Sequence, residues 1–268
     1  MRLSKPKVLL FVAFIIVLFS LLIIPPYLHT MPDLELPIKK AIGFLEKSNE
    51  PHALLWLDVI YRRFGIEEFA DSVQRYDQVL NELPGEQLQL HVFRRIVDRD
   101  NLIQQRDLER FVGLDRLVVP ALYCDRFGLS DDYAELLENN VNFGEYELTH
   151  VLLALVWMRD NGCEVPLSDS SISNLYGANA ALINSDHVVE DLELEAAAFL
   201  YLVKQEGFVQ DFFIEQVIAA QNDDGGWSIS GDDQEDSGWH PTVLGLLLLL
   251  HVEFPSSSYP PILSTISP

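Results

Sequence analysis

The sequence predicts an all-α protein, in which a ring of helical hairpins follows one transmembrane helix. Three observations predict it: an unbroken apolar run near the N-terminus, the scarcity of alternating apolar and polar residues typical of strands, and a helical plan that recurs along the rest of the chain. With 268 residues, of which 49% are hydrophobic, the chain is long enough to bury a sizeable core.

The predicted transmembrane anchor covers residues 8–24, where Ser20 is the only polar side chain. In a helix, a run of this length spans about 25 Å, near the lower limit for a bilayer core. A cleavable signal peptide is the alternative. We favour the uncleaved anchor because the run is longer than a usual signal-peptide core and because no small-residue cleavage site follows it. The lipid bilayer is therefore an expected partner.

The charges around this run predict the topology. Residues 1–7 form a basic tail with three positive side chains and no acidic one. Because positive flanks stay on the cytoplasmic side, we expect a single-pass membrane protein with its N-terminus in the cytoplasm. A linker at 25–37 would then lead to a helical domain at 38–268 on the extracytoplasmic side, in the periplasm or outside the cell.

The charge of the chain excludes one class of partner. Its formal net charge is -23, and acidic residues outnumber basic ones by 41 to 18. A body with this charge repels nucleic acid and anionic lipid headgroups, but it tolerates cations. We therefore expect no nucleic-acid partner.

The chain has two cysteines, Cys124 and Cys163, and neither lies in a CxxC motif or a Cys/His cluster. This excludes a zinc knuckle and a thioredoxin-type motif. Both cysteines lie beside apolar helical runs, so buried free thiols are the expected state, with a disulfide as the alternative.

An internal repeat organises the helical domain. Five segments open on a polar residue and continue as an almost wholly apolar helix, and the first four close on a glycine 12 or 13 residues later. Such a glycine is typical of a helix C-cap. The opening residues are His52, Asp115, His150, Glu195 and His240.

Between the apolar segments lie amphipathic ones, such as 38–47, 132–139 and 211–220. A helix that is apolar all round is buried on every side, whereas an amphipathic helix covers it from outside. This alternation favours a closed ring of inner and outer helices. An open helical solenoid is the alternative, since it too is built from helical hairpins.

The stretch 217–227 carries a short motif. Gln221, Gly225 and Trp227 have the spacing Q-x3-G-x-W, and a helix opening on Trp239-His240 follows. The stretch 217–250 resembles the Gln-Trp repeat of terpenoid cyclases and protein prenyltransferase β subunits. The resemblance implies an α/α toroid. In the prenyltransferases the histidine that matches His240 is a zinc ligand.

The catalytic motifs of both families are missing. The prenyltransferase Asp-x-Cys pair is replaced by Glu193-Leu-Glu195, which offers no thiolate, and the D-x-D-D motif of the cyclases is absent. The resemblance therefore implies the fold without the chemistry of either family.

Three opening residues form a candidate metal site. His150, Glu195 and His240 are each 45 residues apart, so equivalent hairpins would place them at one end of a shared cavity. Two imidazoles and a carboxylate suit a divalent metal such as zinc, with a position open for water. Glu147, three residues before His150, could be a fourth ligand or could orient one. The alternative is that these are helix-start polar groups that satisfy one another.

Two other acidic groups suggest chemistry. Glu190, Asp191, Glu193 and Glu195 form an acidic helix start, which the helix dipole explains in part and which could also supply paired carboxylates for acid/base work on a glycan. The candidate catalytic residues are Glu147, Glu193 and Glu195. The loop 223–236 is rich in carboxylates and could bind calcium, but a solvated loop explains it as well.

Two functions remain open. One is a metal-dependent enzyme that acts in the toroid cavity. The other is a non-catalytic, membrane-tethered binding or assembly module. The small-molecule, glycan or protein partner is not predicted by the sequence.

Overall fold

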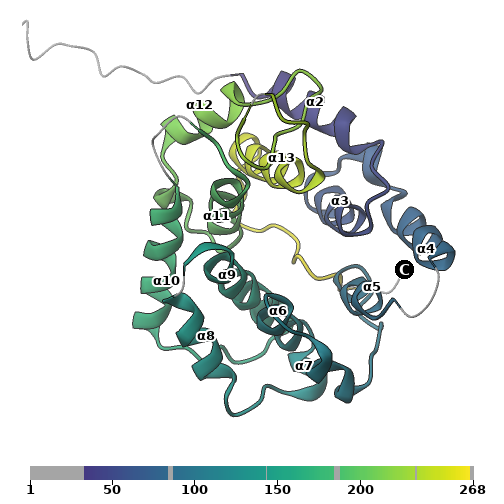
Figure 1. The fold of residues 1–268 in the computed structure, drawn as a ribbon, viewed down its shortest axis with the longest axis vertical. Helices are drawn as coiled ribbons and strands as arrows, with labels where there is room; N and C mark the ends of the chain where they lie inside the picture. The colour runs from purple at the N-terminus through teal and green to yellow at the C-terminus, as the bar shows by residue number, and fades with distance from the viewer. Residues whose placement is uncertain (1–32, 84–86, 143, 184–187, 233, 266–268) are drawn as a thin grey trace, which may run out of the picture. The chain divides into compact units, whose positions relative to one another are not determined.

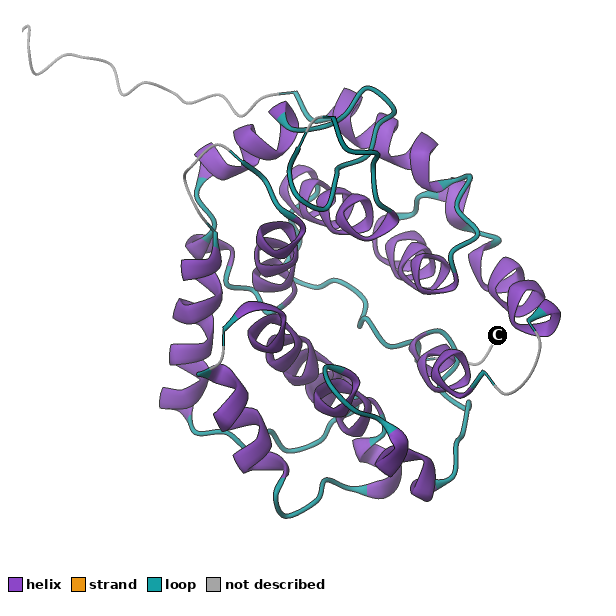
Figure 2. Cartoon of the chain, viewed as in Figure 1, coloured by secondary structure: helices purple, strands orange, loops and turns teal. Residues whose placement is uncertain are grey.

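Helices form the whole regular structure of the described chain. The computed structural model describes residues 33–83, 87–142, 144–183, 188–232 and 234–265. These residues form α-helices and short 3-10 helices and no strand, with one isolated bridge between Trp227 and Gly238 (Figure 2). The all-α prediction is confirmed.

The helices of Leu34–Pro268 are arranged in two layers (Figure 1). The inner layer surrounds the centre, and its first and last helices, α3 and α13, pack against each other. The inner helices are α3 (Pro51–Phe64), α5 (Leu88–Phe93), α6 (Asp115–Leu122), α9 (Glu145–Asp160), α11 (Asp191–Leu202) and α13 (Trp239–Glu253). The outer helices are α2 (Glu35–Leu45), α4 (Ser72–Glu82), α8 (Tyr133–Val141), α10 (Asp169–Leu182) and α12 (Asp211–Ala219).

Side-chain burial follows the two layers. On α13, every residue from Pro241 to His251 is buried, whereas on the outer helix α10 the buried residues are Leu175 and Asn179. A helix with neighbours on all sides needs apolar side chains all round, and a covering helix needs them on one face. The alternation of apolar and amphipathic segments in the sequence therefore predicts the layer to which each helix belongs.

A predicted glycine closes the first inner helix. Gly65 follows α3 in the left-handed conformation, with φ 70°, and its amide donates to the carbonyl of Tyr61 at 2.8 Å. The fourth predicted glycine, Gly207, lies instead in a 3-10 helix, because α11 ends earlier, at Leu202.

The Gln-Trp motif joins three helices. The Trp227 indole donates to the Val217 carbonyl at 2.7 Å, and the Gln221 amide donates to the Pro37 carbonyl at 2.9 Å. The indole also lies against Gly245 of α13, where an added Cβ would come within 2.9 Å of the ring. The motif thus fixes α12 against the start of α2 and the middle of α13.

Cys124 and Cys163 form a disulfide, so the expected free thiols are not present. Cys124 begins the short helix α7 (Cys124–Phe127) after α6, and Cys163 follows α9. Because α6 and α9 pack against each other, their C-terminal ends bring the two Cα atoms to 6.3 Å. The pairing depends on this packing, which the sequence does not reveal.

The prediction of a membrane-spanning helix is corrected. In the part of the chain that the structure describes, no helix combines the length and apolar content needed to cross a membrane. The apolar helices α9 and α13 have 16 and 15 residues, against about 20 for a bilayer core. This finding overturns the predicted single-pass topology with an extracytoplasmic domain. The predicted anchor at 8–24 lies outside the described residues.

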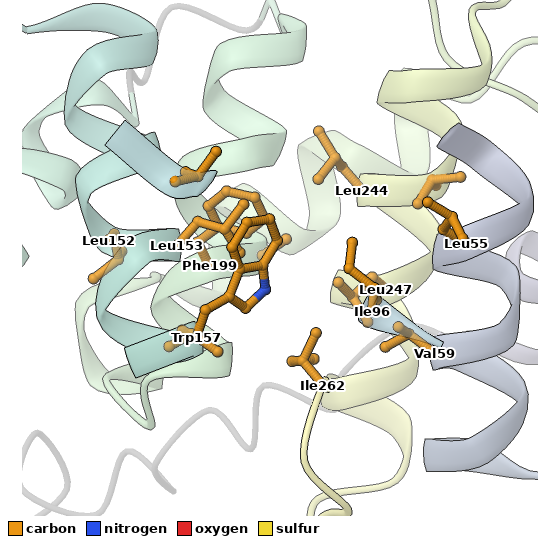
Figure 3. Close-up of a cluster of buried hydrophobic side chains, with 14 of the residues drawn as sticks. Leu55, Val59, Ile96, Leu152, Leu153, Trp157, Phe199, Leu244, Leu247 and Ile262 are labelled. Carbon is orange, nitrogen blue, oxygen red and sulfur yellow. The ribbon is translucent and has the colours of Figure 1, made fainter. Parts of the chain in front are cut away.

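The C-terminal segment packs into the inner layer from the end opposite the helix starts. Ile262 and Leu263 are buried, and their amides donate to the Asp160 carboxylate at the end of α9. The Arg62 side chain donates to the Ile262 carbonyl at 2.8 Å. Figure 3 shows Ile262 at one end of the cluster of apolar side chains between the two sides of the inner layer.

Candidate functional site

The inner helices enclose a cavity of about 160 Å³. Aromatic and aliphatic side chains from α3, α5, α6, α9, α11 and α13 form most of its wall, and polar side chains gather near the helix starts. The apolar lining residues are Leu55, Trp56, Phe93, Ile96, Val118, Leu153, Trp157, Phe199, Trp239, Val243 and Leu244.

Each inner helix contributes one residue to the polar part of the cavity wall. All five residues that open the apolar segments of the sequence lie here, and Gln89 of α5 makes the sixth. His52 and His240 are the second residues of α3 and α13, and Asp115 is the first residue of α6. The hairpins therefore place their opening residues at equivalent levels around one cavity.

Glu195 is the centre of this polar group. It is fully buried, and its Oε1 lies 3.2 Å from His150 Nδ1 while its Oε2 lies 3.4 Å from His240 Nε2. The Thr149 hydroxyl also donates to Oε1. The structure thus brings His150, Glu195 and His240 together, as their spacing predicts.

Asp191 joins the group, although it is not among the metal ligands or catalytic residues predicted from the sequence. Its Oδ1 accepts a hydrogen bond from His240 Nδ1 at 2.7 Å, and its Oδ2 accepts one from the Tyr146 hydroxyl at 2.6 Å. Asp191 is buried and lies one turn before Glu195, so both carboxylates share a face of α11. That four-residue spacing is the signal that could have identified it.

Glu193 and Glu147 lie apart from this cluster. The Glu193 carboxylate accepts from the Glu190 amide at 3.0 Å, in a capping box at the start of α11. Glu147 is half-buried on α9 and does not line the cavity. The structure therefore does not bring either of these predicted catalytic carboxylates to His150, Glu195 and His240.

Each histidine has its Nδ1 tied to an acceptor. His240 Nδ1 donates to the Asp191 carboxylate, and His150 Nδ1 lies 2.8 Å from the Tyr146 backbone carbonyl. Because a carbonyl oxygen and a carboxylate only accept, Nδ1 carries the proton in both rings. Nε2 of each histidine is then the nitrogen available to a ligand, as is usual for metal-binding histidines.

The charges of the cluster favour a cation. Burial opposes the charged form of His240, but the hydrogen bond to Asp191 and the charges of Asp191 and Glu195 outweigh it and raise the pKa of the imidazole. Burial and the adjacent Asp191 carboxylate raise the pKa of Tyr146, so its hydroxyl stays protonated and continues to donate.

Asp191, Glu195 and His240 fulfil the geometric requirement for a metal site. Each offers one ligand atom, and these atoms all lie within 4.8 Å of one another. His150 contacts Glu195 but does not belong to this closest group. The structure thus supports part of the metal prediction. These residues form a group that could hold an ion, and Asp191 is added to the residues predicted from the sequence.

Two carboxylates of the acidic loop at 223–236 accept hydrogen bonds from nearby serines. Asp224 accepts from the Ser237 hydroxyl at 2.7 Å, and Glu235 accepts from the Ser230 hydroxyl at 2.7 Å. Within the described ranges, the only group of three ligands close enough for a metal is the one at Asp191, Glu195 and His240. A solvated loop is the interpretation that these contacts favour.

Fold and site together define an all-α protein with a histidine–carboxylate cluster in a central cavity. Comparisons with known protein families, with curated proteins and with solved structures find no match to this chain.

Proposed function

We propose that this chain is an α/α toroid whose central cavity is a metal-dependent active site. Three features support the toroid: the alternation of inner and outer helices, the packing of α13 against α3, and the Gln-Trp contacts. The proposed metal is a divalent ion such as zinc. Glu195 and His240 would bind it, and Asp191 would orient His240. His150, which contacts Glu195 but lies outside the closest group, would complete the ligand set once its ring turns toward the ion.

One observation carries the metal proposal. Glu195 Oε2 is buried and has no hydrogen-bond partner among the described residues. It lies 3.4 Å from His240 Nε2, which carries no proton when the ring is neutral and Nδ1 donates to Asp191. A lone pair facing a buried carboxylate oxygen is unfavourable unless a positive charge lies between them. A divalent ion would supply that charge and satisfy both atoms.

The ligand set suits hydrolysis. A divalent ion bound by three protein ligands lowers the pKa of a bound water and so provides a nucleophile near neutral pH. Asp191 fixes the orientation of His240, and Tyr146 in turn fixes Asp191. The His240 side chain is 32% exposed, so the ion would lie toward the open end of the cavity, where water can reach it.

The alternative is a binding or assembly module in which the cluster is structural. The direct contacts of His150 and His240 with Glu195 favour it, because a proton on His240 Nε2 would also balance the carboxylate. The metal-dependent enzyme would contain a bound ion, whereas the module with a structural cluster would not.

Elemental analysis of the purified full chain distinguishes them. We expect about one divalent ion per chain, lost in Glu195→Gln and in His240→Ala. His52→Ala is the matched control, since His52 lines the same cavity but pairs with Glu50 instead. A chain that takes up no divalent ion when zinc is added, or equal uptake in all variants, would favour the structural cluster.

A further inference from the structure

We infer that the cavity binds a small cationic molecule, an amine carried on a single aromatic ring. The claim that this molecule is a substrate rests on the proposed function. Its binding to the cavity can be measured with or without metal. Cavity size, an unpartnered indole and the charge of the polar wall support it independently.

The size limits the ligand. A cavity of about 160 Å³ has room for one ring and a short arm, since an engineered apolar cavity of about 150 Å³ accommodates benzene. Beyond the apolar wall, Ile262 of the C-terminal segment is buried, and the adjacent Ser264 amide donates to the Ile96 carbonyl at 2.9 Å. This segment closes the apolar end, so a ligand must place its polar group at the helix starts.

The apolar wall favours an aromatic ring over an alkyl group. Trp56 and Phe199 stack with their ring centres 6.1 Å apart, and Phe93 lies 6.2 Å from Trp157. Trp157 Nε1 is buried, and nothing in the described part of the chain accepts its hydrogen bond. Figure 3 shows this nitrogen facing the side formed by Ile96 and Leu247. The π face of an aromatic ligand accepts such an N–H, and an alkyl chain does not.

The polar wall favours a positive head group. Asp115 and Glu195 line it and Asp191 lies behind Glu195, while the described lining residues include no lysine or arginine. If the metal occupies Glu195, the carboxylate left for a ligand is Asp115, one oxygen of which accepts from Gln89 Nε2 at 2.8 Å. An ammonium group pairs with such a carboxylate and with aromatic faces, whereas a carboxylate or phosphate head is repelled.

Calorimetric titration of the full chain, both zinc-loaded and chelator-treated, with benzylamine, benzyl alcohol and benzoate tests the head group. We expect benzylamine to bind about tenfold more tightly than benzyl alcohol in the chelator-treated chain, and benzoate to bind most weakly there, whereas a bound zinc ion would itself attract the benzoate carboxylate. Asp115→Asn, which preserves the shape of the side chain, should remove the advantage of the amine and leave benzyl alcohol binding unchanged. In the chelator-treated chain, benzoate binding equal to or tighter than benzylamine, or no binding of any of the three, would overturn the inference.

The ring is tested separately with cyclohexylmethylamine. We expect it to bind several-fold more weakly than benzylamine, and Trp157→Phe to abolish that difference. Equal binding of the two amines to the unaltered protein would contradict the aromatic preference. A chain that binds benzylamine in both preparations but never binds metal would overturn the proposed function and leave this inference standing.

Discussion

His240 and Asp191 are 49 residues apart in the sequence, and in the structure a 2.7 Å hydrogen bond joins His240 Nδ1 to Asp191 Oδ1. This bond fixes the ring so that Nε2 faces Glu195, on the same helix as Asp191. A carboxylate behind a histidine is the usual support of a metal ligand. The contact thereby turns two helix starts into one candidate site.

Replacing Asp191 tests its orienting role. We expect Asp191→Asn to weaken zinc binding by roughly 10–100-fold, because the amide keeps the shape but loses the charge that fixes the histidine. Competition with a chromogenic zinc chelator measures the change. Asp115→Asn is the control, since Asp115 lines the same cavity without contacting His240. Equal zinc affinity in Asp191→Asn and the unaltered chain would show that Asp191 has no such role.

Gly245 is required by the Trp227 indole. An added Cβ would lie 2.9 Å from that ring, so we expect Gly245→Ala to reduce the free energy of unfolding by about 1–3 kcal/mol. Gly177→Ala is the matched control on α10, where an added Cβ meets no atom within 4 Å, and it should stabilise by about 0.4–1 kcal/mol. Urea denaturation measures both. A neutral Gly245→Ala would contradict the described packing.

His251 should make stability depend on pH. Burial and the neighbouring Arg63 lower its pKa from 6.5 to about 3 in the folded chain, so protonation favours the unfolded chain. Its contribution is fully present above pH 6.5 and is lost as the pH falls toward 3, at about 1.4 kcal/mol per pH unit. Urea denaturation at a series of pH values should show a shallower loss in His251→Gln. Parallel curves for the two proteins would disprove the buried neutral state.

The disulfide should stabilise the domain without affecting the site. The 39-residue separation between Cys124 and Cys163 predicts a loss of roughly 2–4 kcal/mol in the double serine variant. Zinc binding should be unchanged, because Cys163 follows the C-terminal end of α9 whereas His150 lies near its start. Thermal unfolding and zinc titration of the folded variant check the two statements. Loss of zinc binding from a variant that remains folded would show that the two ends of α9 are coupled.

Sequence reasoning could predict the level of the site because each apolar segment opens on a polar residue, and the last three of these are 45 residues apart. His52, Asp115, His150, Glu195 and His240 do line one cavity. Gln89 could not be found in this way, because α5 has only six residues and is not an almost wholly apolar helix that opens on a polar residue. Local residue types determine where a helix starts, but they do not determine what lies opposite it.

The remaining differences arise from helix packing. Which of the carboxylates on α11 faces His240 depends on the rotation of α11 against α13, so Asp191 joins the site and Glu193 caps the helix. The pairing of Cys124 with Cys163 likewise depends on how α6 lies along α9. The apolar run at 8–24 predicts a membrane helix from composition alone, and none of the helices described in the structure meets that expectation.

The central claim is that Glu195 and His240 bind one divalent ion, and a crystal structure of the zinc-soaked chain, with anomalous data at the zinc edge, tests it most directly. We expect a single strong peak at about 2.0–2.2 Å from Glu195 Oε2 and His240 Nε2. A map without a peak there, in which His240 Nε2 instead donates directly to Glu195, would contradict the claim.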